Sequence, residues 1–408
     1  MDENSFKKEH NTKTRTPSSR SLCNLGEHHL SDSVTKDLGL KRRLTLRNDK
    51  MRGASMVVRT LKVGVVGCGR IASAVHLPCY LMMPNAQVVS VMDVVRERAQ
   101  STARAFHVKK WYSNYEEMLK DNEVEAVDIC SPPSMHAEQA IEAAKSGKHI
   151  LCEKPISMNL DDALKLESEV GKAGVMFMTG FTYRFHPLLQ KTKAEIPNPR
   201  LLRVSYSFHP SVALDHWLAR ARYDFNKSGG FIVEQAVHWF DLFRWFSGKA
   251  KSVYAKGQVN PSSQNIVSLI SYENDALGLV NFNTDSSLSF FLLTIENTEK
   301  SAMLRMGLLP TKWGGLLQIS NRLRKPDSYF LNSWGAKKTW KRASFPISFV
   351  MSKIQDSHLI PFYHEIQHFV HSILENSPPQ VTLKDGLDSL RIAIATKESI
   401  EQGKEIYL

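Results

Sequence analysis

Residues 61–74, which read LKVGVVGCGRIASA, decide the fold of this chain. A short apolar run rich in β-branched residues enters a glycine turn and continues into a sequence compatible with a helix. This order is the G-x-G-x-x-A form of the dinucleotide-binding fingerprint. Gly67 permits the turn, Gly69 lets the backbone approach a pyrophosphate, and Ala72 keeps the helix close to the strand. The stretch therefore predicts a strand–turn–helix unit that binds a dinucleotide.

The residues around this turn complete the predicted cofactor site. Arg70 and Ile71 begin the helix, whose N-terminal N–H groups and positive potential suit phosphates. Asp93 closes the next apolar run, where a carboxylate can reach a ribose hydroxyl. Asp93 favours NAD, because it pairs with the ribose hydroxyls and repels a 2′-phosphate, whereas Arg96 and Arg98 nearby would suit NADP.

Length and composition set the broad class. A chain of 408 residues with a hydrophobic fraction of 42% can form two folded units and a tail. No window approaches the roughly 18 uncharged apolar residues of a membrane span, so we expect a soluble protein without a membrane partner. The five cysteines are odd in number and form no C-x-x-C pair, which argues against a disulfide scaffold or a metal site. They fit a reducing compartment, and we expect a cytoplasmic protein.

The net charge of +12 is concentrated in two regions. Residues 1–60 contribute +6 and residues 301–345 contribute +8, which leaves the rest of the chain nearly neutral. Nucleic-acid binding is therefore not predicted for the folded body. The basic stretch 301–345 has three readings: a loop that recognises an anionic substrate, a nucleic-acid or membrane surface, or a solvated sheet face with insertions.

The chain divides into a tail and two domains. Residues 1–56 are polar and without period, which predicts a disordered basic tail. Between 57 and 180, apolar runs alternate with amphipathic segments, which indicates an α/β domain with a parallel sheet. We expect its strands near 61–66, 87–92, 126–130, 148–152 and 175–179, and its helices near 70–82, 94–106, 114–120, 134–146 and 159–173.

The second domain, 181–408, has a different pattern. Alternating segments predict strands of a mostly antiparallel sheet, and one helix near 232–246 interrupts them. We expect an α+β domain with one sheet covered by helices on one face. Two helices follow, which we expect to pack back on the first domain. The predicted strands lie near 203–208, 252–258, 266–272 and 277–283, and the final helices near 360–375 and 385–402.

Polar residues follow two strands of the first domain. Ser131, Pro132 and His136 come after one strand, and Glu153-Lys154-Pro155 follows the next. Ligands of an open parallel sheet bind at the carboxyl ends of its strands, so we expect these residues to face the cofactor. A lysine in a partly dry cleft can take part in proton transfer. A plain turn and a surface Glu–Lys pair are the alternatives.

A third group lies in the stretch 228–241, SGGFIVEQAVHWFD. Glu234 and His238 are four residues apart, and Asp241 follows three residues later, so on a helix all three share one face. Carboxylates on both sides can orient an imidazole for proton transfer. The alternative is a capped amphipathic helix with a hydrogen-bonded histidine.

Together these features resemble the Gfo/Idh/MocA oxidoreductases, the family of glucose–fructose oxidoreductase and inositol dehydrogenase. The resemblance covers about 60–300 and 358–408. It rests on the glycine turn, the Glu153-Lys154-Pro155 triplet, the block from Gly229 to Asp241, and the C-terminal pattern from Phe362 to Gly403. The segment 181–185 also resembles the family's entry into the second domain.

The resemblance implies an N-terminal Rossmann domain, doubly wound, and a C-terminal domain whose open sheet often mediates oligomerisation. Lys154 matches the family's catalytic or substrate-binding lysine, and His238 matches its acid/base histidine. Glu234 stands where many members have aspartate. Arg184 matches an arginine that often faces the substrate, and we expect Asp241 to bind substrate with it.

We therefore predict an NAD(P)-dependent dehydrogenase or reductase that acts on a secondary alcohol or ketone of a sugar, cyclitol or related polyol. His238 moves the hydroxyl proton, Lys154 binds the same oxygen, and Glu234 orients the site. The substrate can be anionic if the basic stretch lines the cleft, and we expect a homodimer or homotetramer. The alternative is a non-catalytic nucleotide-binding regulator or sensor with the same fold.

Overall fold

A computed structural model describes residues 59–207, 230–259, 264–284, 286, 290–306, 315–321, 324–332, 335–339 and 359–408. The predicted tail lies outside these ranges, as do Ser228 and Gly229 of the third group. Among the described helices, none has both the length and the apolar character needed to cross a membrane.

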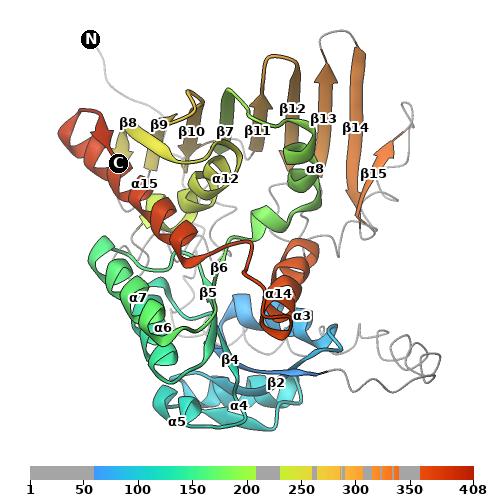
Figure 1. Cartoon of the computed structure of the whole chain (residues 1–408), viewed down its shortest axis with the longest axis vertical. Coiled ribbons are helices and arrows are strands. Elements are labelled where there is room, and N and C mark those ends of the chain that lie inside the picture. Colours follow the sequence, from blue (N-terminus) through green and yellow to red (C-terminus); the bar gives the residue numbers. More distant parts are fainter. Residues whose placement is uncertain are drawn as a thin grey trace, which may run out of the picture. The chain divides into compact units, whose positions relative to one another are not determined.

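The first domain contains a parallel sheet of six strands, in the order β3-β2-β1-β4-β5-β6 (Figure 1). This arrangement confirms the predicted doubly wound sheet. Five strands begin and end within two residues of the predicted positions, and β3 was not predicted because it is short and only half-buried. The strands are β1 (Leu61–Val66), β2 (Ala86–Met92), β3 (Lys110–Tyr112), β4 (Ala126–Ile129), β5 (His149–Glu153) and β6 (Phe177–Gly180).

Helical segments connect these strands, close to the predicted positions. The segment after the glycine turn begins with a π-helical turn, η1 (Ala72–His76), and continues as α3 (Leu77–Leu81). The others are α4 (Arg96–Ala105), α5 (Tyr115–Leu119), α6 (Pro133–Lys145) and α7 (Leu160–Ala173). Asn159 caps α7, because its side chain accepts a hydrogen bond from the N–H of Asp162.

The chain order of the strands reverses between β1 and β4, which are neighbours in the sheet. In such sheets the crevice for a ligand opens at this point, beyond the carboxyl ends of the strands. Gly67 follows β1, Ser131 comes shortly after β4, and Glu153 ends β5. The topology therefore brings the predicted polar residues to one edge of the sheet.

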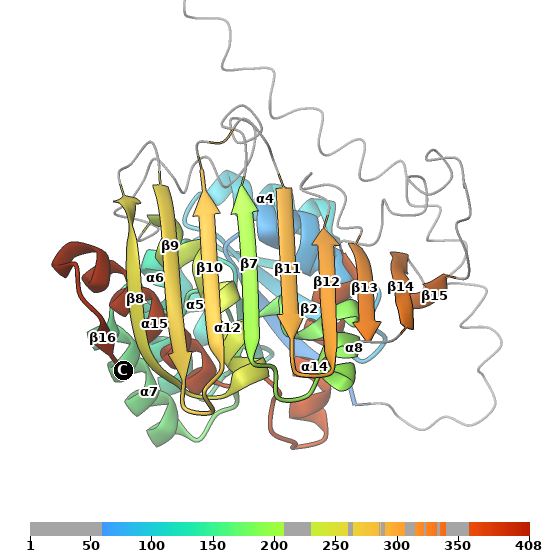
Figure 2. The same ribbon diagram turned by 90° about the horizontal axis from the view of Figure 1, so that it is seen from above.

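The second domain contains a ten-stranded sheet in the order β15-β14-β13-β12-β11-β7-β10-β9-β8-β16. It is antiparallel except for the β7–β10 pair, as predicted, and Figure 2 shows its strands side by side. The strands are β7 (Leu201–Ser207), β8 (Ala250–Val259), β9 (Gln264–Tyr272), β10 (Leu277–Asn283), β11 (Phe290–Glu296), β12 (Lys300–Met306), β13 (Gly315–Asn321), β14 (Arg324–Asn332), β15 (Gly335–Thr339) and β16 (Ile406–Tyr407).

The strands from β11 onward were not predicted. Much of the basic stretch 301–345 belongs to β12, β13, β14 and β15, which extend one end of the sheet. This placement fits the reading of the stretch as part of a sheet with insertions.

Helices cover one face of this sheet and connect it to the first domain. α12 and α15 contact each other, and α15 contacts β8 as well as β6 and α7 of the first domain. α14 contacts α3 and β1, so both C-terminal helices pack on the first domain. The segments are η2 (Thr182–Phe185), α8 (Pro187–Glu195), η3 (Ile232–Ala236), α12 (Val237–Ser247), α14 (Leu359–Leu374) and α15 (Leu383–Gln402).

Candidate active site

The glycine turn after β1 has the geometry that a dinucleotide needs. Gly67 has a φ of +88°, and a Cβ at this position would lie 2.8 Å from the backbone nitrogen of Ser131. The turn therefore packs directly against the loop after β4. A Cβ on Gly69 would meet no described atom within 4 Å, so this side of the turn is open. Ala72 is buried against the sheet, as the fingerprint requires.

Asp93 lies at the end of β2 with both carboxylate oxygens held. Oδ2 accepts a hydrogen bond of 2.9 Å from the N–H of Cys68, and Oδ1 accepts one of 2.9 Å from the N–H of Val95. Arg98 contacts both oxygens at 3.2 Å. Arg96 instead lies over the ring of Trp111. The carboxylate is therefore fixed beside the glycine turn, where the residues fit the ribose of a dinucleotide.

The loop after β4 holds its polar groups differently. Pro132 is exposed just before α6, and the Ser131 hydroxyl donates to Gln139. His136 is buried, with its ring nitrogens 2.6 Å and 2.8 Å from the carbonyl oxygens of Pro155 and Ser131. The geometry therefore favours a role for His136 in joining two loops, rather than the predicted contact with the cofactor.

The triplet after β5 turns its carboxylate inward and directs its lysine toward the second domain. Glu153 and Lys154 are both buried, and the Lys154–Pro155 peptide bond is cis. One oxygen of Glu153 accepts the N–H of Lys154 at 3.1 Å. The ammonium nitrogen of Lys154 lies 3.0 Å from the backbone carbonyl oxygen of Glu234 in η3. The structure thus brings Lys154 and the helix of the third group together.

Glu234 and His238 carry buried polar atoms without a partner. Among the described residues, no hydrogen-bonding group reaches Glu234 Oε2 or His238 Nδ1. Burial raises the pKa of Glu234 to about 7, although the nearby charge of Lys154 opposes this. Burial, and then Lys154, lowers the pKa of His238 well below its ordinary value. The imidazole is therefore neutral at pH 7 and able to accept a proton.

The ring of His238 is also positioned by aromatic packing. The Tyr183 ring lies 4.9 Å from the imidazole centroid, and the Phe181 ring lies 6.2 Å away. The helix begins with the π-helical turn η3, a feature frequent at functional sites. The spacing of Glu234 and His238 indicated a shared face, but nothing in that pattern indicated the aromatic neighbours.

Arg184 and Asp241 are engaged with each other. The guanidinium Nε donates to an Asp241 oxygen at 2.8 Å, and a second nitrogen lies 2.9 Å from Asp385. Both Arg184 and Asp241 are almost fully buried. The geometry therefore does not support the expected role of Asp241 in orienting His238, or a role of Arg184 and Asp241 in substrate binding. It favours a structural role, in which the Arg184–Asp241 and Arg184–Asp385 contacts join η2, α12 and α15.

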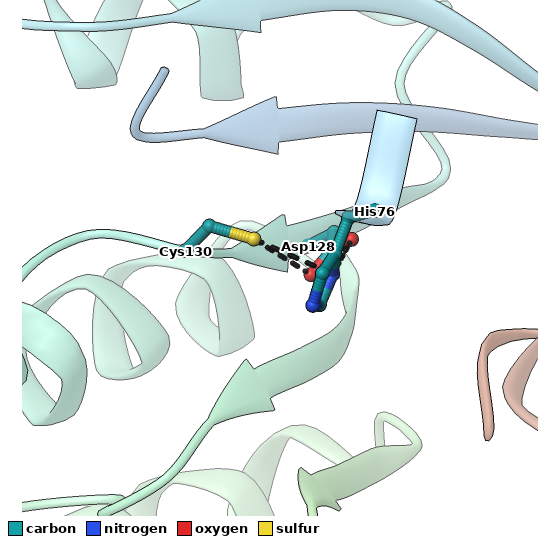
Figure 3. A group of neighbouring side chains, drawn as sticks. All are labelled: His76, Asp128 and Cys130. Atoms are coloured by element: carbon teal, nitrogen blue, oxygen red, sulfur yellow. Dashed lines mark hydrogen bonds and ion pairs between the residues drawn. The ribbon is translucent and has the colours of Figure 1, made fainter. Parts of the chain in front are cut away.

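A further buried group lies at the carboxyl end of β4, where His76 of η1 meets Asp128 and Cys130 (Figure 3). His76, Asp128 and Cys130 offer possible metal-ligand atoms that all lie within 4.8 Å of one another. The His76–Asp128 distance of 2.8 Å is that of a hydrogen bond, so an ion is not needed to hold them. Sequence reasoning missed this group. The signal was an aspartate inside the buried run Ala126–Ile129.

Comparison with known proteins agrees with this geometry. A family model described as an oxidoreductase family with an NAD-binding Rossmann fold matches residues 61–181, and the GFO/IDH/MocA C-terminal domain matches residues 193–299. The chain belongs to the GFO/IDH/MocA oxidoreductase family.

Two curated inositol dehydrogenases match over nearly their whole length. Myo-inositol 2-dehydrogenase of Thermotoga maritima is 26% identical over 85% of this chain and 98% of its own. The scyllo-inositol 2-dehydrogenase (NAD(+)) of Bacillus subtilis is also 26% identical, over 85% of this chain and 96% of its own. Levoglucosan dehydrogenase in complex with NADH and levoglucosan has a similar fold, with a TM-score of 0.70 and 22% identity over 86% of this chain and 99% of its own.

Family and relatives support the enzyme and not the regulator. The protein is an NAD(P)-dependent oxidoreductase of the class that acts on sugar and polyol hydroxyl groups.

Proposed function

We propose that the protein is an NAD-preferring dehydrogenase that oxidises a secondary alcohol of a cyclitol or a pyranose-like polyol. The observation that carries this proposal is a pair of buried atoms, Glu234 Oε2 and His238 Nδ1, that have no partner in the described part of the chain and lie near the Lys154 ammonium. Buried polar atoms without partners are costly, and vicinal hydroxyl groups can satisfy both. The curated relatives named as inositol dehydrogenases support a ring polyol of this kind.

Each residue of this group has a distinct proposed role. Neutral His238 accepts the proton of the reacting hydroxyl, because its lowered pKa leaves the imidazole unprotonated at pH 7. Lys154 donates a hydrogen bond to the same oxygen and stabilises the negative charge that develops on it. Glu234, with its raised pKa, binds a neighbouring hydroxyl. The bound nicotinamide supplies the hydride acceptor.

The cofactor site involves the turn and the loops at the sheet edge. The N–H groups of Gly69, Arg70, Ile71 and Ala72, at the start of the helix after the turn, bind the pyrophosphate. Asp93 binds the ribose hydroxyls and so favours NAD. Ser131 and Pro132 border the nicotinamide side, while His136 and Glu153 hold the loops in place.

The open face of the ten-stranded sheet supports a homo-oligomer. Leu269 of β9 stands opposite Tyr254 of β8 and Leu279 of β10, and Val267 lies two residues away on the same face. Leu269 and Tyr254 are each 40% exposed, so a row of apolar side chains crosses the three strands. Exposed apolar rows of this kind are covered in oligomers. We propose a dimer or tetramer formed through this face.

The four cysteines in the described part of the chain are buried free thiols, Cys68, Cys79, Cys130 and Cys152. They support a reducing compartment, and we propose the cytoplasm.

The test is a panel of polyols assayed with NAD⁺ and with NADP⁺ by absorbance of the reduced cofactor. The panel contains myo-inositol, scyllo-inositol, levoglucosan, glucose and glucose 6-phosphate. We expect turnover of at least one ring polyol with NAD⁺, and a loss of about 100-fold or more in kcat for Lys154→Met. Lys172→Met is the matched control, because that lysine is exposed on α7. Absence of turnover, with NADH binding intact, contradicts the proposed substrate class.

A further inference from the structure

A chain of buried charged groups lies behind Lys154. His76 Nδ1 is 2.8 Å from an Asp128 oxygen, and His76 Nε2 is 3.2 Å from Oε1 of Glu153. The other oxygen of Glu153 accepts the backbone N–H of Lys154 at 3.1 Å. His76 and Asp128 are essentially inaccessible to solvent, with exposures of 1% and 0%. The chain therefore runs from the middle of the parallel sheet to the lysine at its edge.

The charges along this chain alternate. Burial lowers the pKa of His76, but the charges and hydrogen bonds of Asp128 and Cys130 together raise that pKa well above its ordinary value. Burial raises the pKa of Glu153, but the hydrogen bond and charge of His76 leave it lower than usual. Only an imidazolium has two N–H donors, and here two carboxylates accept them. The three groups in order are thus the carboxylate of Asp128, the imidazolium of His76 and the carboxylate of Glu153.

Other titratable groups face His76 from neighbouring elements. Cys130 Sγ lies 3.4 Å from Nδ1, and burial raises the pKa of its thiol. Cys79 on α3 and Glu365 on α14 also face this group, and burial raises the pKa of both. Burial therefore favours the neutral form of Glu365. Tyr80, facing Asp128, is likewise held neutral by burial.

We propose that His76 is a positioning residue for Lys154: it holds Glu153 through an ionic hydrogen bond, and Glu153 holds the backbone from which the lysine reaches Glu234. Without the His76–Glu153 contact, the Glu153 side chain that accepts the backbone N–H of Lys154 is no longer held. Without the His76–Asp128 contact, Glu153 is still held by His76. The distinction matters because displacement of a reacting group by about 1 Å can cost about 100-fold in rate.

The contacts of the two ring nitrogens of His76 can be removed one at a time by substitution. In His76→Gln the amide nitrogen replaces Nε2 and keeps a donor for Glu153. In His76→Asn it replaces Nδ1 and keeps a donor for Asp128. Each variant removes the positive charge and leaves one carboxylate without its partner, so they form a matched pair. A purely structural role predicts equal effects.

The first measurement is kinetic and rests on the proposed function. With myo-inositol and NAD⁺, or the best polyol of the panel, we expect kcat to fall about 3-fold in His76→Gln and at least about 30-fold in His76→Asn, with KM for NAD⁺ within about 2-fold of wild type in both. Glu153→Gln removes the carboxylate that His76 contacts, and its loss in kcat is expected to match that of His76→Asn. This variant therefore replaces His76→Asn in the test if the asparagine variant does not fold. Equal losses in the two histidine variants, or a larger loss in His76→Gln, overturn the proposal.

The second measurement does not need turnover. In protein labelled with ¹⁵N-histidine, the His76 resonances, assigned by their loss in His76→Gln, are expected to show two protonated ring nitrogens from pH 6 to 8. In protein labelled with ¹³C-lysine, the side-chain signal of Lys154, assigned with Lys154→Arg, is expected to move in His76→Asn more than in His76→Gln. A neutral or metal-bound imidazole, or equal movement of the lysine signal, overturns the proposal. If wild type turns over no polyol, only the proposed function fails, and these spectra still decide the role of His76.

Discussion

The ammonium nitrogen of Lys154 lies 3.0 Å from the backbone carbonyl oxygen of Glu234. Lys154 follows β5 of the parallel sheet, and Glu234 lies in the π-helical turn before α12. These residues are 80 positions apart in the sequence, so this contact brings together the lysine of one domain and the helix of the other that carries Glu234 and His238.

Replacement of His238 by asparagine is expected to remove the proton acceptor. In its proposed role the neutral imidazole is the general base, so kcat for polyol oxidation should fall about 10²–10⁴-fold, while the affinity for NADH measured by fluorescence stays within about 2-fold. His371→Asn is the control, because this half-buried histidine lies on α14 away from α12. Undiminished turnover in His238→Asn contradicts the assigned role.

Glu234 should give the stability of the protein a measurable pH dependence. Its pKa is raised from 4.5 to about 7, so between these values the folded protein holds a proton that the unfolded chain releases. The contribution of Glu234 to the free energy of unfolding therefore falls as the pH rises through this window, by about 3 kcal/mol at most.

Urea unfolding of wild type and Glu234→Gln at pH 5 and pH 8, without cofactor, measures this effect. His238 acts in the opposite direction below pH 6.5, but it is present in both proteins and cancels in the difference. We expect the stability of wild type relative to the variant to be lower at pH 8. A difference that does not change with pH shows that the carboxyl group has an ordinary pKa.

Arg184→Met should destabilise the fold rather than weaken substrate binding alone. The variant leaves the buried Asp241 carboxylate without its partner, which costs about 3–5 kcal/mol in the free energy of unfolding. Arg184→Met with Asp241→Asn should recover part of this loss. Arg203→Met is the control, because this exposed pair with Glu296 is worth less than about 1 kcal/mol. A raised KM for substrate with unchanged stability would restore the substrate-binding role.

Asp93→Ser should weaken the preference for NAD. The variant loses a charged acceptor for the ribose hydroxyls. Arg98, which contacts Asp93 in the wild type, then becomes available to a 2′-phosphate. Hydrogen bonds to charged groups are worth about 1.5–3 kcal/mol, so the ratio of kcat/KM for NAD⁺ to that for NADP⁺ should fall about 10- to 100-fold. The assay compares both cofactors at one polyol concentration, and an unchanged ratio rules out Asp93 as the selecting residue.

A charge on the open sheet face should disrupt the oligomer. Leu269→Lys places an ammonium in the apolar row of β8, β9 and β10, and burying it in an interface carries a desolvation cost. We expect a smaller mass than wild type in light scattering coupled to size exclusion. Glu401→Lys changes an exposed residue of α15, away from this face, and should keep the wild-type mass. Equal masses for all three proteins argue against this face as the interface.

The sequence alone determined the first domain and the composition of the site. Apolar runs and glycine positions are local signals, so β1, the glycine turn and the helix after it were predicted nearly to the residue. The motif around Lys154 and the spacing of Glu234 and His238 identified the residues that the structure brings together. The later strands of the second sheet were missed, because their pairing depends on partners that no local pattern specifies.

Tertiary structure alone decided which polar groups engage one another. The Arg184–Asp241 pair, the enclosure of His136 between two carbonyl oxygens, and the contact of His76 with Asp128 and Glu153 all join residues that are distant in the sequence. Sequence patterns report burial and local conformation, whereas the partner of a buried charge is set by packing between elements. The same packing fixes the charge states of Glu234 and His238, since desolvation dominates both pKa shifts.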